Sequence, residues 1–385
     1  MRSRLLAVLL ILAMFVVFVG CGGSEKESAA AEPAAEKQEA AASNPIPPAP
    51  EKKENPAVAD ADYTIRIAIN APSYQSTPTI QWEQEYALCD IFEHIVEARA
   101  GGRINVEVYP DGQLGDHKAT CEMVQSGALE AAVGTGTMGQ FFAPFEILYI
   151  PYLFKSEEIA WDVLDNSQFW KDFCVDFENE TGLTVLAMGQ NGTRNFTHAK
   201  KQIKTPADLK GERIRVMTSP IFVEMMKAFG ADAVPIAWNE LYTSLQTGVV
   251  DGQENPISVI ATNGLYEVQD YLTLDGHLWS EDYFVMNTDF LSSLPEDLQQ
   301  IVKVAAHQAA VVNRAVETIH SQSTGLAHLA EVGMNVYTPT VAEKQQYADI
   351  AQPPVIEYLR AKVDAKYIDG LMDAVADSEK KFGYR

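Results

Sequence analysis

Two arginines stand in segments where a buried cation would need an anionic partner. Arg194 lies in the Gly- and Asn-rich segment "QNGTRNFTH", and Arg215 lies in the short apolar segment "RIRV". A guanidinium on the face of a sheet is costly to bury unless an anion pairs with it. Its planar fork matches a carboxylate, which binds it through two hydrogen bonds. The partner of Arg215 is therefore either a ligand carboxylate or an internal acid, Asp251 or Glu254.

Asn255 follows these arginines in the segment "GVVDGQENP". An asparagine before a proline is most simply a turn residue, because its side chain hydrogen-bonds the local backbone. The residue type alone therefore leaves a structural role and a ligand-binding role for Asn255 both open.

The segment "AAVGTGTMGQFF" contains a G-x-G-x-x-G pattern at Gly134, Gly136 and Gly139. A dinucleotide site needs a helix that starts directly after these glycines, so that its N–H groups face the pyrophosphate. The residues that follow, "QFFAPFEILYIPYLF", contain two prolines and many aromatics and make a poor helix start. We therefore predict no dinucleotide cofactor, and interpret the glycines as a strand edge where the backbone passes close to another group, such as a ligand.

Other chemistry is not indicated. The sequence has no G-x-S-x-G nucleophile pattern and no C-x-x-C or H-E-x-x-H metal motif, and its seven histidines are scattered. We predict no catalytic residue, no metal site and no cofactor. The formal net charge of −24 leaves no basic stripe for a nucleic acid, so that class of partner is excluded.

The N-terminus resembles a bacterial lipoprotein signal. Arg2 and Arg4 precede a short apolar stretch that ends in "FVGCGGS", which predicts a signal peptide over 1–20 and a lipid on Cys21. The alternative is an ordinary signal peptide whose cysteine is accidental. The segment 21–62 is rich in Ala, Glu, Lys and Pro, and we predict a disordered tether. A protein anchored in this way faces the periplasm or cell envelope and does not span the membrane.

Three further cysteines, Cys89, Cys121 and Cys174, remain in the body. Because their number is odd, at least one stays unpaired, and a bridge between Cys89 and Cys121 remains open.

Strand-like and helix-like segments alternate from residue 63 onward, which predicts an α/β fold with largely parallel sheets. The segment "LTVLAMG" reads as a strand and the following "QNGTRNFTH" as a polar loop. A long helical pattern begins at Pro295 and reaches about residue 332, with Gly325 as a point of interruption. A helix of this length is suited to bracing two lobes.

Several segments then match a known family in order and spacing. They are "GGRINVEVYPDGQLGD", "YIPYLF", "NGTR", "DLKGERIRV", "ELYTSLQTGVVDGQENP", "LYEVQDYLTLDGH" and "LPEDLQ". The body resembles the solute-binding proteins of tripartite ATP-independent periplasmic (TRAP) transporters, dicarboxylate type.

The resemblance implies a two-lobed periplasmic-binding-protein clamshell of type II-like form, with a long helix spanning both lobes. It implies lobe I over 63–191 and 281–320, and lobe II over 192–280 and 321–385. Closure over a ligand would be a hinge motion.

The resemblance also implies the site. Arg215, Arg194 and Asn255 would bind the ligand carboxylate, with Asn70 as a further contact. The remaining positions that would tune specificity are His117, Thr135, Met138, Thr218 and Trp238. For Trp238 the alternative is a core position on an amphipathic helix.

These positions carry few charged side chains, so we expect a small organic acid with an apolar or aromatic body. A 2-oxo acid, an aromatic acid and a sulfonate remain open. The implied partners are the small and large membrane permease subunits of a TRAP transporter, driven by an ion gradient. The alternative is a receptor for a sensor kinase or chemoreceptor, and an enzyme is less favoured.

Overall fold

The computed structural model describes residues 55–73 and 83–384. The predicted signal peptide, Cys21 and most of the predicted tether lie outside the described residues. The last part of the tether does not follow the prediction of disorder. Pro56–Val58 form a 3-10 turn, Asn55 donates a hydrogen bond to Glu97 at 2.7 Å, and Val58 is buried. The folded body therefore begins several residues before Tyr63.

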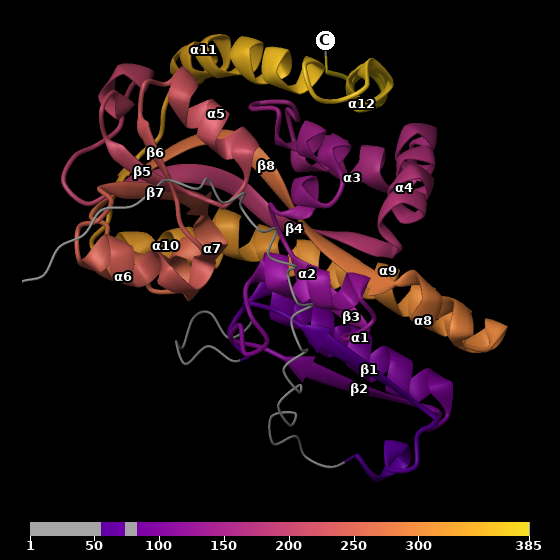
Figure 1. The fold of residues 1–385 in the computed structure, drawn as a ribbon. Coiled ribbons are helices and arrows are strands. Elements are labelled where there is room, and N and C mark those ends of the chain that lie inside the picture. The colour runs from indigo at the N-terminus through magenta and orange to yellow at the C-terminus, as the bar shows by residue number, and fades with distance from the viewer. Residues whose placement is uncertain (1–54, 74–82, 385) are drawn as a thin grey trace, which may run out of the picture. The chain divides into compact units, whose positions relative to one another are not determined.

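The strands of the body join into one mixed sheet in the order β2-β1-β3-β8-β4-β7-β5-β6, with β9 paired to β8 (Figure 1). Their bounds are β1 Tyr63–Ala68, β2 Ile104–Tyr109, β3 Ala131–Gly134, β4 Leu183–His198, β5 Arg213–Val216, β6 Asp232–Pro235, β7 Gly252–Pro256, β8 Tyr271–Asn287 and β9 Asn335–Tyr337.

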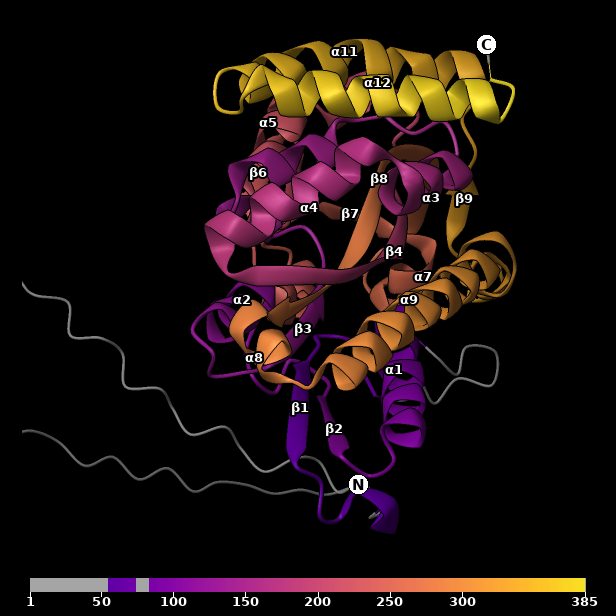
Figure 2. The ribbon, with the colours of Figure 1, turned by 90° about the vertical axis from the view of Figure 1, so that its right-hand side faces the viewer.

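Parallel pairs occur at both ends of this sheet, where β1 pairs with β2 and β3, and β5 pairs with β6 and β7. The centre differs from the largely parallel sheet expected, because β4 and β8 are long antiparallel partners. Figure 2 shows these two strands running together through the middle of the body. They link the two groups of parallel strands into one structure.

The segment "QNGTRNFTH" is strand and not the loop that the sequence analysis expected. β4 continues through it to His198, and its register against β8 shifts three times, between Val185 and Ala187, Gln190 and Gly192, and Arg194 and Phe196. Such bulges bend a strand without ending it. The polar composition that suggested a loop comes from side chains buried between neighbouring strands.

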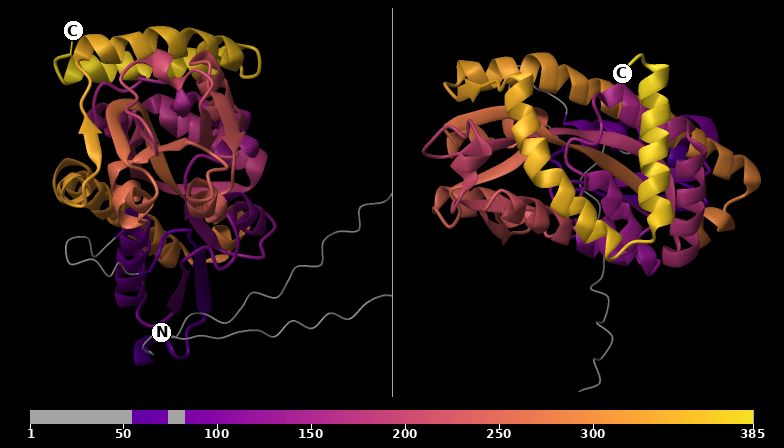
Figure 3. Two further views of the ribbon diagram at one scale, coloured as in Figure 1. Left: turned by 90° about the vertical axis from the view of Figure 1, so that its left-hand side faces the viewer. Right: turned by 90° about the horizontal axis from the view of Figure 1, so that it is seen from above.

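The helices cover both faces of the sheet. Their bounds are α1 Gln84–Ala100, α2 His117–Gln125, α3 Glu157–Asn166, α4 Gln168–Thr181, α5 Pro220–Ala228, α6 Leu241–Gln246, α7 Ile257–Thr262, α8 Thr288–Ser293, α9 Glu296–Ile319, α10 Gly325–Glu331, α11 Val341–Arg360 and α12 Ala365–Lys381. The helices α11 and α12 form a V when seen from above and lie at the end opposite β1 and β2 (Figure 3).

The long helix is continuous across the expected interruption. A π-turn over His320–Thr324 joins α9 to α10, and a Cβ on Gly325 would meet the carbonyl oxygen of His320 at 2.5 Å. Glycine at this position therefore permits the wider turn instead of breaking the helix. α9 packs on α1 and α10 packs on α7, so the helix reaches from the β1 side to the β7 side.

Apolar side chains form separate clusters on either side of the crossing strands. One lies between α1, α9 and the strands near β1, and another lies between α6, α7 and α10. A larger cluster lies under α3, α4, α5, α11 and α12. Cys89 and Cys121 belong to different clusters, and both are free thiols, as is Cys174. None of the described helices combines the length and the apolar character that a membrane span requires.

Candidate functional site

A pocket lies where β1, β3, β5, β6 and β7 contribute residues at or just beyond their carboxyl ends, opposite the starts of α1 and α2. Its volume is about 620 Å³, including the space at its mouth that is open to solvent. The carboxyl ends of strands are where open α/β sheets bind ligands.

Seven of the nine ligand-contact residues expected from the sequence line this pocket, and two do not. The seven are Asn70, His117, Thr135, Arg215, Thr218, Trp238 and Asn255. Arg194 and Met138 are fully buried behind the wall.

Arg215 presents an unpaired guanidinium to the pocket. The strand β5 is short and buried, and places Arg215 between Ile214 and Val216 with only 2% of its surface exposed. Its Nε donates to the carbonyl oxygen of Ile236 at 3.0 Å, whereas Nη1 has no hydrogen-bond partner in the described part of the chain. Burial lowers the pKa of Arg215 to about 10, so the group stays charged at neutral pH.

The two internal acids that could have neutralised Arg215 are engaged elsewhere. Asp251 pairs with the guanidinium of Arg213 at 2.8 Å. Glu254 pairs with Arg194 at 2.5 Å between the Nε and Oε2 atoms, and neither side chain is exposed. Of the two interpretations of Arg215, the geometry therefore favours an anion bound in the pocket.

Arg194 does not line the pocket, so the arrangement gives no support to the expected contact with the ligand carboxylate, which stays untested. Its Nη2 donates to Glu254 Oε1 at 2.9 Å and to Asn255 Oδ1 at 2.8 Å. β4 continues as a strand where a loop was expected, and this places Arg194 directly beside β7. Arg194 thus holds Asn255 from behind.

Asn255 is a strand residue at the end of β7 and not the turn residue that its position before Pro256 suggested. Its Oδ1 accepts from Arg194, and its Nδ2 donates to Gln253 Oε1. An amide NH₂ has two hydrogens, so one remains for a group in the pocket.

A buried ionic network stands behind this end of the pocket. His277 contacts Asp275 through Nδ1 at 2.8 Å and Glu254 through Nε2 at 3.2 Å. Burial favours neutral imidazole, but Asp275 and Glu254 outweigh it and raise the pKa of His277 to about 9. Burial likewise opposes ionisation of Glu254, but Arg194 and His277 lower the pKa of Glu254 to about 2. His277 and Glu254 are therefore both charged at neutral pH.

His117 is the first residue of α2, which Asp116 caps by accepting from the Ala119 N–H at 2.8 Å. Burial lowers the pKa of His117 to about 4, with a further contribution from the positive charge of Arg215. The imidazole is neutral at physiological pH. Its Nδ1 has no partner among the described residues.

The three glycines of the G-x-G-x-x-G segment allow close packing around the pocket. A Cβ on Gly134 would meet His117 Nδ1 at 2.5 Å, and one on Gly136 would meet Met217 Cε at 2.4 Å. A Cβ on Gly139 would meet Glu146 Cγ at 2.4 Å. Gly139 lies within a short 3-10 turn, Met138–Gln140, and the chain continues into a second 3-10 turn, Ala143–Tyr149, and not into an α-helix. The interpretation of a backbone that passes close to other groups agrees with this arrangement.

The remaining wall combines polar and apolar side chains. Thr135 Oγ1 and Asn70 Oδ1 are buried without a hydrogen-bond partner in the described residues. Trp238 is half-buried and packs against the α6–α7 cluster while it also lines the pocket. Its contact with a ligand stays a prediction. Met138 lies in the cluster under α3 and α4, because the 3-10 turn directs it away from the pocket.

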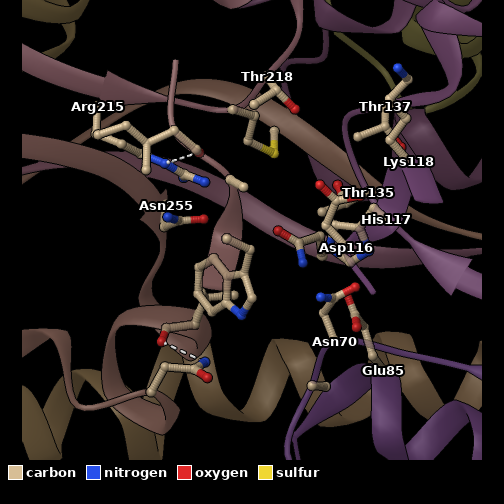
Figure 4. A pocket seen from close by; sticks show the side chains of 18 of the residues that line it. Asn70, Glu85, Asp116, His117, Lys118, Thr135, Thr137, Arg215, Thr218 and Asn255 are labelled. Carbon is tan, nitrogen blue, oxygen red and sulfur yellow. Dashed lines mark hydrogen bonds between the residues drawn. The ribbon is translucent and has the colours of Figure 1, made fainter. Parts of the chain in front are cut away.

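Sequence reasoning missed the acidic residues of the pocket, Glu83, Glu85 and Asp116, and also Lys118. Acids in the first turn of a helix are common, because they interact favourably with the helix dipole. The segment "QWEQEY" therefore does not indicate a binding role. Figure 4 shows Arg215 and Asn255 on one side of the pocket and Asn70, Glu85 and His117 on the other.

Comparison with known proteins identifies the family. Residues 80–361 match the family model "Bacterial extracellular solute-binding protein, family 7", also called DctP. The chain belongs to this family. A protein of Verminephrobacter eiseniae, described as a solute-binding protein, is 36% identical over 281 residues, which are 73% of this chain and 81% of that protein.

Solved structures of periplasmic solute-binding proteins share this fold. The sugar acid binding protein DctPAm of Advenella mimigardefordensis, in complex with galactonate, has a TM-score of 0.76 and 27% identity, and the match covers 83% of this chain and 99% of that one. A TRAP periplasmic solute binding protein of Desulfovibrio salexigens with bound orotic acid has a TM-score of 0.75 and 29% identity, with the same coverage. This family 7 chain is a solute-binding receptor of the TRAP type.

Proposed function

We propose that this receptor captures a small organic acid and binds its carboxylate to Arg215. The observation that carries the proposal is the charged, buried guanidinium of Arg215, whose Nη1 is unpartnered and which lines the pocket. A buried charge without a partner is costly, and a ligand carboxylate supplies the missing one through charge-assisted hydrogen bonds.

Asn255 donates its free amide hydrogen to the same carboxylate, while Arg194 acts as a positioning residue behind it. Asn70, His117, Thr135, Thr218 and Trp238 contact the rest of the ligand. The flat indole of Trp238 suits an apolar or aromatic body, and orotic acid in the Desulfovibrio salexigens protein is a carboxylate of this kind.

Binding closes the two lobes over the ligand. The proposed lobe limits, after residues 191 and 280, fall on β4 and β8, where Gly192 and Ser280 are register partners. The pocket takes Asn70 and His117 from proposed lobe I and Arg215 and Trp238 from proposed lobe II. A ligand that contacts both sets stabilises the closed arrangement, and the bulged crossing strands are the hinge.

The receptor then delivers the acid to small and large permease subunits in the membrane, without converting it chemically. Its place is the periplasmic side of the cell envelope, where the lipid proposed on Cys21 and the segment 21–54 would keep the body near the permease.

Mass spectrometry of ligand released from the purified, denatured protein tests this function. We expect a carboxylate-bearing molecule small enough for the pocket, and we expect the same molecule to rebind in a calorimetric titration. A released ligand without an acidic group that rebinds equally well to Arg215→Ala would overturn the proposal.

A further inference from the structure

The pocket has a second polar end that differs from the Arg215 end in chemistry. Asn70 Oδ1 and Glu85 Oε2 are hydrogen-bond acceptors with no partner in the described part of the chain. Asn70 is 5% exposed and Glu85 is 4% exposed, and both line the pocket. Figure 4 shows them together, across the pocket from Arg215 and Asn255.

The free oxygen of Glu85 is not explained by the helix that carries it. Glu83 caps α1, because its Oε2 accepts from the N–H groups of Glu85 and Tyr86 at 2.7 and 3.2 Å. The backbone N–H of Ala71 hydrogen-bonds the Glu85 carboxylate, which fixes the direction of this side chain. One oxygen of Glu85 is thus left to a group inside the pocket.

The two ends also differ in the charged groups around them. Arg215 is influenced by Glu254 and Arg194, whereas Glu85 is influenced by Asp282 and Glu83. Burial and these two acids raise the pKa of Glu85 well above its usual range. Burial and Asp282 also raise the pKa of Glu83, to about 8. A positive charge beside Glu85 would favour its ionised form, which a neutral hydroxyl does far less.

From this geometry we propose that the ligand is a zwitterion. On this proposal, which rests on the proposed function, its carboxylate binds Arg215, and a cationic N–H group, an ammonium or amidinium, binds Glu85 and Asn70. The cation donates to Glu85 Oε2 and Asn70 Oδ1, and the half-buried ring of Trp238 offers a surface that attracts cations. Glu85 is therefore the residue that separates zwitterions from simple acids.

Matched pairs of compounds test the proposal on the whole mature protein. Each pair joins a zwitterion to the acid that lacks its nitrogen: pipecolate with cyclohexanecarboxylate, proline with cyclopentanecarboxylate, and γ-aminobutyrate with butyrate. Thermal shift ranks the pairs and calorimetry measures the binders, beside the charge class of the ligand released from the denatured protein.

We expect zwitterions to bind better than their partners, and a basic nitrogen in the released ligand. Glu85→Gln keeps the shape of the side chain and should weaken zwitterion binding by about 10-fold or more, with little change for the simple acids. Glu93→Gln is the control, because Glu93 lies on the same helix and does not line the pocket.

Two outcomes separate the proposals. If simple acids bind better than zwitterions and the released ligand has no basic nitrogen, the zwitterion proposal is overturned while the organic-acid receptor stands. If neither class binds and the released ligand has no carboxylate, the proposed function fails as well. Both outcomes are measured on the wild-type protein, so they can be decided even if the Glu85→Gln variant does not fold.

Discussion

Arg194 and Glu254 are joined by hydrogen bonds at 2.5 and 2.9 Å, and neither side chain has any exposed surface. This pair lies directly behind Asn255, whose Oδ1 accepts from the same guanidinium. It pairs one arginine and one acid of the strand pair β4–β7, and leaves Arg215 as a buried arginine that faces the pocket without an acidic partner.

Replacing Arg194 should therefore damage the fold first. In Arg194→Met, Glu254 is left buried without its partner, so the free energy of unfolding should fall by about 3–5 kcal/mol. Urea denaturation of the unliganded protein measures this change. Unchanged stability together with lost binding would instead place Arg194 in direct contact with the ligand.

Replacing Arg215 should instead stabilise the unliganded protein and weaken ligand binding. Arg215→Met removes a buried charge that has no acidic partner, so the unliganded protein should gain about 1–3 kcal/mol of stability. Ligand binding should weaken by roughly 3–5 kcal/mol, because the ligand carboxylate is left unpaired. Denaturation and calorimetry on the same preparation check both effects, and unaltered affinity would remove Arg215 from the site.

Thr135 and Met138 are three residues apart and should differ in effect. Thr135→Val keeps the side-chain shape and removes a hydroxyl that lines the pocket, so affinity should fall by up to about 10-fold. Met138→Leu, in the core, should leave affinity within about 2-fold and cost less than about 1.5 kcal/mol of stability. Equal losses of affinity in both variants would contradict this assignment.

Trp238 should set the order in which ligands bind. Trp238→Ala removes a half-buried wall of the pocket, and affinity for acids with an aromatic or apolar body should fall more than affinity for small acids. Competition binding with a graded series of carboxylates measures the ranking. A uniform loss across the series would leave Trp238 with a packing role only.

His277 should make stability depend on alkaline pH. Its folded pKa of about 9 lies above the usual 6.5, so its contribution is complete below pH 6.5 and is lost as pH rises through 9. The difference in unfolding free energy between wild type and His277→Gln should shrink by about 1–3 kcal/mol over this window. Denaturation midpoints at a series of pH values measure it, and a difference that is constant with pH would show that His277 is not charged in the fold.

The sequence by itself predicted much of this protein. Motif order and spacing identified the solute-binding family, and apolar periodicity located most helices and strands. An arginine inside an apolar strand indicated that Arg215 needs an anionic partner, because a buried guanidinium has few stable environments, but it left a ligand and an internal acid both open.

Only the tertiary structure decided how the charges are paired. Arg194 and Arg215 look equivalent along the chain, but the continuation of β4 as a strand brings Arg194 onto Glu254 and leaves Arg215 facing the pocket. In the sequence, Glu85 is an ordinary acid in the first turn of a helix. Only the fold, which brings the start of α1 beside the end of β1, shows that Glu85 lines the pocket with one carboxyl oxygen unpartnered among the described residues. Pairing depends on distances between residues far apart in sequence, and local patterns carry no information about those distances.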